Sequence, residues 1–260
     1  MTHAWPSDEP RRQLSGRLDR IDLLRAVAML WMTVYHFCFD LNYHRLLRED
    51  FYQDPFWTWQ RTAIVSLFLF TAGLSQAVAL HQGQSWARFW RRWRQVALAA
   101  LLVTAGSWWM FPRGFIYFGV LHGIAVMLII VRLTAGWGRW LWWLGGLAIL
   151  VKYLAPAMMA SAPALLVFNA PWLNWLGFIN RLPVTEDYVP LLPWLGVMWW
   201  GVAAGRWALV RRPSWLGAAD APATGVKRGL AAMGRWSLSY YLLHQPVMLG
   251  LLGAWVWLAR

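Results

Sequence analysis

The chain has 260 residues, of which 59% are hydrophobic and 13% charged, and its formal net charge is +13. Soluble domains average about 25% charged residues, and one water-soluble core of this size could not bury so much apolar surface. The composition excludes a disordered chain, and a single cysteine, Cys38, excludes a disulfide scaffold. Because the basic residues do not form a patch on a soluble domain, we expect no nucleic-acid partner.

Seven stretches are apolar over about 17–25 residues, the length that crosses a bilayer as a helix. They lack the two-residue alternation of barrel strands. The sequence therefore predicts an all-α, polytopic helical membrane protein with about seven transmembrane helices. The predicted spans are 22–41, 62–80, 95–111, 115–133, 137–155, 189–210 and 236–258.

The loop charges predict the orientation. Most of the 24 Lys and Arg residues fall on the side of the N-terminus, whereas acids balance the basic residues of the other side. This asymmetry predicts a cytoplasmic N-terminus and an outer C-terminus. Residues 1–20 are polar and arginine-rich, so we expect a cytoplasmic segment there and a single transmembrane domain over 21–260. The pattern leaves open whether 163–180 crosses, re-enters or lies on the membrane.

The first span carries the most polar residues for its length. At about 100° per residue, its polar positions share one stripe with Met29. Within the stripe, His36 and Asp40 are four residues apart and can meet directly. Ionisable groups within spans are usually functional, so His36 is a candidate general base that Asp40 would orient. The alternative is a polar clamp between helices. The stripe consists of Arg25, Met29, Thr33, His36 and Asp40.

Three further histidines extend the candidate site. His44 would continue the stripe if the first helix ran on, which makes it a second candidate base. His122 and His244 lie deep in the fourth and seventh predicted spans. Each alone is typical of a helix contact, but together with His36 they indicate a shared polar interior. No close spacing of His, Cys, Asp or Glu favours a metal, and we expect none.

Several of these motifs occur together, in order, in one known family. The chain resembles the bacterial family related to the catalytic domain of heparan-alpha-glucosaminide N-acetyltransferase, within the transmembrane acyltransferases. The motifs are Arg20-x-Asp22-x-x-Arg25, Tyr35-His36-Phe with Asp40-Leu, Phe70-Thr-Ala-Gly73-Leu-Ser75, Gly119-Val-Leu-His122, Asp187-Tyr-x-Pro-Leu-Leu-Pro-Trp194 and Gly234-Arg-x-Ser237-Leu-x-x-Tyr241-Leu-x-His244-Gln-Pro246.

The resemblance implies acetyl transfer across the inner membrane of a bacterium. The donor would be cytoplasmic acetyl-CoA, and the acceptor an amino sugar or other cell-envelope glycan on the outer side. Ala26 stands where the family usually has Gly. The animal enzyme's catalytic histidine follows the helix that corresponds to the first span, and an amide occupies the position matching His36. The choice between His36 and His44 as the base is therefore open.

Chemistry and resemblance together suggest a role for each polar residue. A base must take the proton of the attacking amine or hydroxyl, an oxyanion needs a donor, and phosphates need cations. We expect His36, Asp40 and His44 to be catalytic, and the acetyl-CoA site to include Arg25, His122, His244 and Arg235. The expected acceptor site consists of Asn42, Asp187, Trp194 and Tyr241. The oxyanion donor could be His122, His244, Asn42 or Tyr241.

Two alternatives fit the same sequence. One is an O-acyltransferase that uses another acyl-CoA. The other is a non-enzymatic transporter or flippase of a polar lipid-linked solute, in which buried His, Asp and Arg would line a pathway. Transporters often contain internal repeats, and the sequence has none. The acceptor, the acyl chain length, a ternary complex against an acetyl-enzyme, and assembly into a homo-oligomer all stay open.

Overall fold

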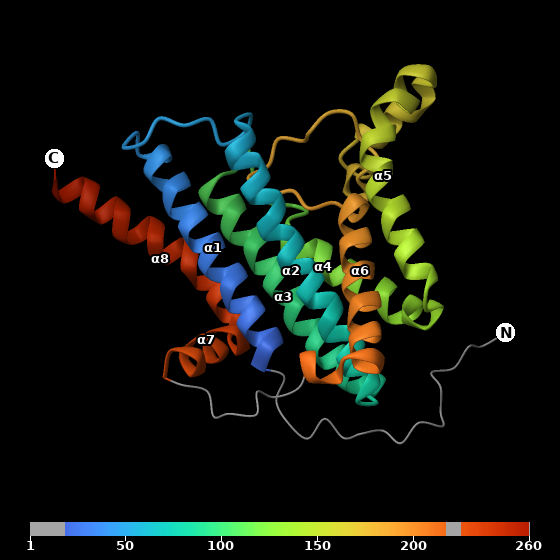
Figure 1. The fold of residues 1–260 in the computed structure, drawn as a ribbon. Coiled ribbons are helices and arrows are strands. Elements are labelled where there is room, and N and C mark those ends of the chain that lie inside the picture. The colour runs from blue at the N-terminus through green and yellow to red at the C-terminus, as the bar shows by residue number, and fades with distance from the viewer. Residues whose placement is uncertain (1–18, 217–224, 260) are drawn as a thin grey trace. The chain divides into compact units, whose positions relative to one another are not determined.

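The computed structural model describes residues 19–216 and 225–259, and in these ranges the regular structure is helical. Their only β-pairing is an isolated bridge between Phe118 and Tyr188. The predicted all-α class is therefore confirmed. Residues 1–18 of the predicted N-terminal segment lie outside the described ranges. The long helices are α1 (Asp19–Tyr43), α2 (Pro55–His81), α3 (Trp86–Met110), α4 (Val120–Thr134), α5 (Trp140–Ser161), α6 (Leu191–Arg211) and α8 (Ser237–Leu258) (Figure 1).

Each of the seven predicted spans overlaps one of these helices, and the protein is a multi-pass membrane protein. Five regions are both long and apolar enough to cross a bilayer: Arg20–Tyr43, Pro55–His81, Val120–Trp137, Trp140–Ser161 and Ser237–Leu258. The helices α3 and α6 are not among these five. Both are long, but Trp and Arg interrupt their apolar runs. The cytoplasmic position of the N-terminus stays a prediction.

The segment that the sequence left open, 163–180, contains no α-helix. It holds two 3₁₀ helices, η2 (Pro163–Asn169) and η3 (Asn174–Leu176). A helix needs about 20 residues to span the hydrocarbon core, so this segment does not cross as a helix. A hydrogen bond holds the start of η3, since the Tyr188 hydroxyl donates to the Asn174 carbonyl over 2.6 Å. Burial raises the pKa of Tyr188, which keeps this hydroxyl protonated as a donor.

The chain divides into two compact units within α2. Of the described residues, the central unit contains 69–213, and the terminal unit contains 19–68, 214–216 and 225–259. The domain prediction over 21–260 is not tested by this division. In the central unit, Gly73 of α2 packs against the backbone of Met198 and Gly201 in α6, where a Cβ atom would collide. The small residues at 70–75 therefore allow close helix packing, as the sequence predicts.

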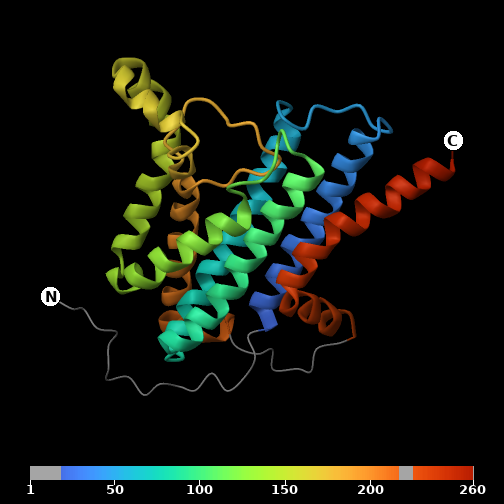
Figure 2. The same cartoon turned by 180° about the vertical axis from the view of Figure 1, so that it is seen from behind.

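In the terminal unit, α1 packs against two segments from the other end of the chain. The helix α8 runs alongside it, and α7 (Gly225–Arg235) packs at its N-terminal end (Figure 2). There, Gly234 touches the backbone carbonyl of Asp22, an approach that a Cβ atom would block. At the other end, Tyr35 and Phe39 of α1 pack edge-on against Phe51 of the following loop. These contacts fix both ends of the helix that carries the predicted site.

Candidate active site

A pair of histidines joins α1 to α8. The Nδ1 atom of His36 lies 2.8 Å from the Nε2 atom of His244, and the rings are nearly parallel with centroids 5.1 Å apart. His244 is the only buried residue of α8, whose other side chains are partly or fully exposed. A helix that buries a single residue, and that residue a histidine, uses it for a specific polar contact. The sequence predicts a polar interior shared by His36, His122 and His244; within the terminal unit, His36 and His244 are in direct contact.

The hydrogen bonds of the pair define the tautomer of each ring. The Nδ1 atom of His244 lies 2.8 Å from the backbone carbonyl of Tyr241, which can only accept. A neutral His244 therefore carries its proton on Nδ1, and its Nε2 atom accepts. His36 must then donate from Nδ1, so its Nε2 atom keeps the lone pair. No described residue hydrogen-bonds to that Nε2 atom. The arrangement leaves His36 with one open basic nitrogen.

Tyr240 and Thr33 hold the pair from one side. The Tyr240 ring stacks on His244 with an interplanar angle of 5° and centroids 5.8 Å apart. Its hydroxyl lies 2.7 Å from Thr33 Oγ1, and Thr33 in turn donates to the Met29 carbonyl. The Thr33 proton is thus used, so Tyr240 donates to Thr33. This chain of bonds restricts the orientation of the His244 ring.

Asp40 makes a different contact from the one that its spacing predicts. Its Oδ1 atom accepts from Gln245 Nε2 over 2.7 Å, and the side chain is 1% exposed. No hydrogen bond between Asp40 and His36 is present in the described part of the chain. The i,i+4 spacing allowed the pair, but α8 supplies a partner to both residues. It is His244, not Asp40, that orients the His36 ring.

Two oxygens beside this contact are buried without a hydrogen-bond partner among the described residues: Asp40 Oδ2 and Gln245 Oε1. A buried unpaired acceptor is costly, and such sites in native proteins require an explanation. Asp40 follows His36 by four residues, about one turn of α1, and Gln245 directly follows His244 on α8. Sequence reasoning missed Gln245 and Tyr240, although both occur inside the His244 motif. The signal was their adjacency to a buried histidine on the same helix.

The two arginines predicted to bind acetyl-CoA lie at the N-terminal end of α1, away from the histidine pair. Arg25 donates to Asp22 over 2.8 Å, and 11 positions separate Arg25 from His36, about 16 Å along the axis. Arg235 is the last residue of α7 and follows Gly234, which touches Asp22. The terminal unit therefore brings Arg25 and Arg235 to the same end.

The remaining residues predicted in the terminal unit lie near the end of α1. His44 follows the last helical residue, and its ring contacts Tyr43 edge-on at 5.3 Å. The Asn42 carboxamide accepts from the backbone N–H of Glu49 over 2.9 Å. The Tyr241 ring lies 5.8 Å from His244, in addition to the contact through its carbonyl.

His122 lies in the central unit, where both of its nitrogens have partners. Thr104 donates its proton to the Ile116 carbonyl, so it accepts from His122 Nε2 over 3.0 Å. The other nitrogen, Nδ1, then accepts from the Gly119 N–H over 3.3 Å, at the start of α4. These bonds make His122 a cap for α4 and a link to α3. No basic nitrogen of this histidine is open.

Asp187 caps the same helix. Its Oδ2 atom accepts from the backbone N–H of Val120, the first residue of α4, over 2.7 Å. A carboxylate at a helix N-terminus pairs with unsatisfied N–H groups and with the positive end of the helix dipole. The predicted span 115–133 accordingly begins only at Val120. Trp194 is half-buried in the first turn of α6.

No group of three or more His, Cys, Asp or Glu residues in the described ranges is placed to hold a metal ion. What distinguishes the terminal unit is therefore a pair of hydrogen-bonded histidines on two membrane helices, in a multi-pass helical protein. The family model for the catalytic domain of heparan-alpha-glucosaminide N-acetyltransferase matches residues 17–246. The chain belongs to this family, and the match includes both histidines. No curated protein and no solved structure matches the chain.

Proposed function

We propose that the protein is an acyltransferase that moves an acetyl group from cytoplasmic acetyl-CoA to an amino sugar or other glycan outside the cytoplasmic membrane of a bacterium. Membership of the family supports membrane acetyl transfer in general. The observation that carries the proposal is the Nε2 atom of His36, to which no described residue hydrogen-bonds, because a general base needs an unoccupied lone pair. A carbohydrate acceptor is favoured over a lipid-linked solute in transit, since a transport pathway needs no such base.

In the proposed reaction, His36 Nε2 takes the proton of the acceptor's amino or hydroxyl group as that group attacks the thioester carbonyl. A C–N or C–O bond forms and the C–S bond breaks. The proton on His36 then passes to the departing thiolate, so the products are the acetylated acceptor and CoA thiol. His244 accepts from His36 Nδ1 throughout and stabilises the imidazolium that forms. Arg25 and Arg235 would bind the CoA phosphates.

The test uses the purified full chain in lipid nanodiscs, acetyl-CoA and glucosamine, with CoA thiol release as the signal. We expect His36→Gln to lower kcat by about 10²–10⁴-fold, the usual loss when a general base is removed. The His44→Gln variant is the matched control, because His44 is the second candidate base. Loss of activity in His44→Gln with normal turnover in His36→Gln would transfer the role to His44. Binding of acetyl-CoA, measured by thermal stabilisation, shows that each variant is folded.

A further inference from the structure

The first nine residues of α3 lie before the apolar run that predicts the third span. The helix begins at Trp86, whereas the predicted span begins at residue 95. At 1.5 Å per residue, the helix therefore extends about 14 Å beyond that run. A membrane helix that extends past its apolar residues enters the headgroup region or the water beyond it.

This first segment of α3 has an arginine face and an aromatic face. At about 100° per residue, each face occupies an arc of roughly 100°, and the two arcs lie on opposite sides of the helix. The arginine face consists of Arg88, Arg91 and Arg92, and the aromatic face of Trp86, Phe89, Trp90 and Trp93. All three arginines are exposed. The segment is thus amphipathic in the way of helices that lie at a membrane surface.

The aromatic face attaches the segment to α4. Trp93 Nε1 donates to the Ala125 carbonyl over 2.8 Å, and Phe89 is buried. The Arg132 guanidinium of α4 lies 5.0 Å from the centre of the Trp86 ring. Because the aromatic face is held against α4, the exposed arginines lie on the opposite side of α3.

The guanidinium groups of the arginine face have few partners. Arg92 donates to Gln95 Oε1 over 2.8 Å, one turn further along α3. Neither the Arg88 nor the Arg91 guanidinium makes a hydrogen bond or ion pair with any residue in 19–216 or 225–259. The first turn of α3 has no acid, and cations near a helix N-terminus oppose the helix dipole. The stability of α3 therefore does not explain these three arginines.

Among the described residues of the central unit, no acidic side chain balances this charge at the same end. The acids within 69–213 are Glu186 and Asp187, and Asp187 caps the first residue of α4. The contact with the start of α3 comes instead from Arg132, in the last turn of α4. Twelve positions, or about 18 Å, separate Val120 from Arg132, which exceeds the Debye length of about 8 Å at physiological salt.

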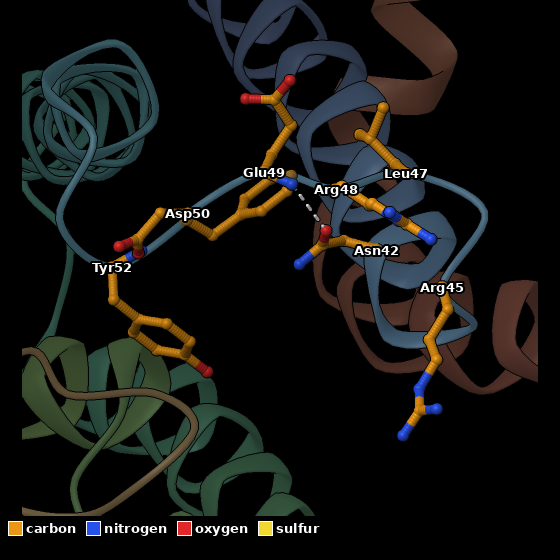
Figure 3. Close-up of a pocket in the computed structure, with 8 residues that line it drawn as sticks. Asn42, Arg45, Leu47, Arg48, Glu49, Asp50 and Tyr52 are labelled. Atoms are coloured by element: carbon orange, nitrogen blue, oxygen red, sulfur yellow. Dashed lines mark hydrogen bonds between the residues drawn. The ribbon is translucent and has the colours of Figure 1, made fainter.

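The loop after α1 shows how arginines are arranged where their charge is balanced. Arg45 and Arg48 share the wall of one pocket with Glu49 and Asp50, so the net charge of that wall is zero (Figure 3). The arginine face of α3 has three positive charges and no acid. Excess positive charge at a membrane surface attracts anionic lipid headgroups, by about fivefold in affinity for each arginine.

We propose that the arginine face of α3 binds the phosphate groups of anionic phospholipids. The three guanidinium groups donate to phosphate oxygens, which match their planar geometry. Trp86 and Trp90 are exposed and stacked with centroids 6.2 Å apart, and they lie at the level of the headgroups, where tryptophan is enriched in membrane proteins. This lipid site does not depend on the proposed acetyl transfer.

The test uses the purified full chain in micelles of dodecyl maltoside, a neutral detergent, to which dioleoyl phosphatidylglycerol is added. The rise in unfolding temperature gives the half-saturating lipid concentration. We expect Arg91→Gln to raise this concentration about fivefold, and the triple variant Arg88→Gln/Arg91→Gln/Arg92→Gln to raise it at least about tenfold. Phosphatidylcholine, which has no net charge, should produce no rise that depends on these arginines.

Two further variants separate charge from structure. Arg88→Lys/Arg91→Lys/Arg92→Lys keeps the charge and should bind phosphatidylglycerol nearly as well as the wild type. Arg45→Gln/Arg48→Gln, in the balanced loop, is the matched control and should leave the half-saturating concentration unchanged. Because all of these side chains are exposed, the unfolding temperature without lipid should stay near the wild-type value. An unchanged concentration in the triple glutamine variant, or an equal loss in the control, would overturn the proposal.

Two other ligands identify the source of the phosphate. Inorganic phosphate carries the same oxygens without acyl chains, and acetyl-CoA is the proposed donor. Neither should stabilise the wild-type chain more than the triple glutamine variant. A rise with inorganic phosphate that depends on the three arginines would assign the site to a free anion, and such a rise with acetyl-CoA would assign it to the donor. Either result would overturn the assignment to lipid.

Discussion

A histidine of the central unit, His122, has two hydrogen-bond partners among the described residues, whereas His36 of the terminal unit has one. This difference distinguishes a structural histidine from a candidate catalytic one. In the central unit, His122 accepts from the Gly119 N–H and donates to Thr104, so its capacity is used within the fold. In the terminal unit, His36 donates to His244, and its other nitrogen has no hydrogen-bond partner in the described part of the chain. Position within a span does not distinguish the two. The count of occupied ring nitrogens does.

Apart from loss of His36 itself, the largest effect is expected when His244, the residue that sets the tautomer of His36, is removed. We expect His244→Ala to lower kcat by roughly 10–100-fold, because His36 would then donate from either nitrogen and would lose its partner in the charged form. Thiol release with acetyl-CoA and glucosamine measures this. The control is Tyr240→Phe, which keeps the stacked ring but not the bond to Thr33. If kcat in His244→Ala matched the wild type, the positioning role would be wrong.

A shift in the pH dependence distinguishes positioning from folding. Because His244 interacts with the charged form of His36, its removal should move the acidic limb of the kcat/KM profile as well as lower its plateau. A variant that is merely less folded would show a lower plateau with the same limb. His244→Gln offers a partial rescue, since an amide oxygen can accept from His36 Nδ1.

Removal of the His122 side chain should have the opposite effect, a loss of stability with little change in kcat. His122→Ala leaves the Gly119 N–H and the Thr104 hydroxyl without this partner, at a cost of about 1–3 kcal/mol in the free energy of unfolding. The unfolding temperature should therefore fall, while kcat per folded molecule stays near the wild-type value. Thermal unfolding and thiol release on one sample check both parts. A large drop in kcat without destabilisation would return His122 to the reacting centre.

The smallest expected effect tests the second cap of α4. Asp187→Ala removes the acceptor for the Val120 N–H, and loss of such a cap costs about 0.5–2 kcal/mol. Asp187→Asn keeps a side-chain oxygen for that bond and should recover most of the stability. The measurement is the unfolding temperature together with KM for the acceptor. An increased KM in Asp187→Asn, at unchanged stability, would instead show that Asp187 binds substrate.

The positions of the helices followed well from the sequence, while the partners of single side chains did not. Each predicted span meets a helix, since length and hydropathy are summed over many residues. The pairing of His36 with Asp40 rested on two residues of one helix, and there the sequence prediction failed. An i,i+4 spacing only permits a contact, and Gln245 of α8 takes the Asp40 carboxylate. A neighbouring helix decides which of the available donors or acceptors a side chain pairs with.

The sequence by itself determined the class of this protein, its membrane helices and its family. These depend on composition and on motif order, which are properties of the chain read in one direction. Only the tertiary structure decided that His36 meets a residue 208 positions away and that both ring nitrogens of His122 hydrogen-bond within the fold, one of them to the first turn of α4. The physical reason is that a hydrogen bond is short and directional, so its partner depends on how helices far apart in the chain pack together.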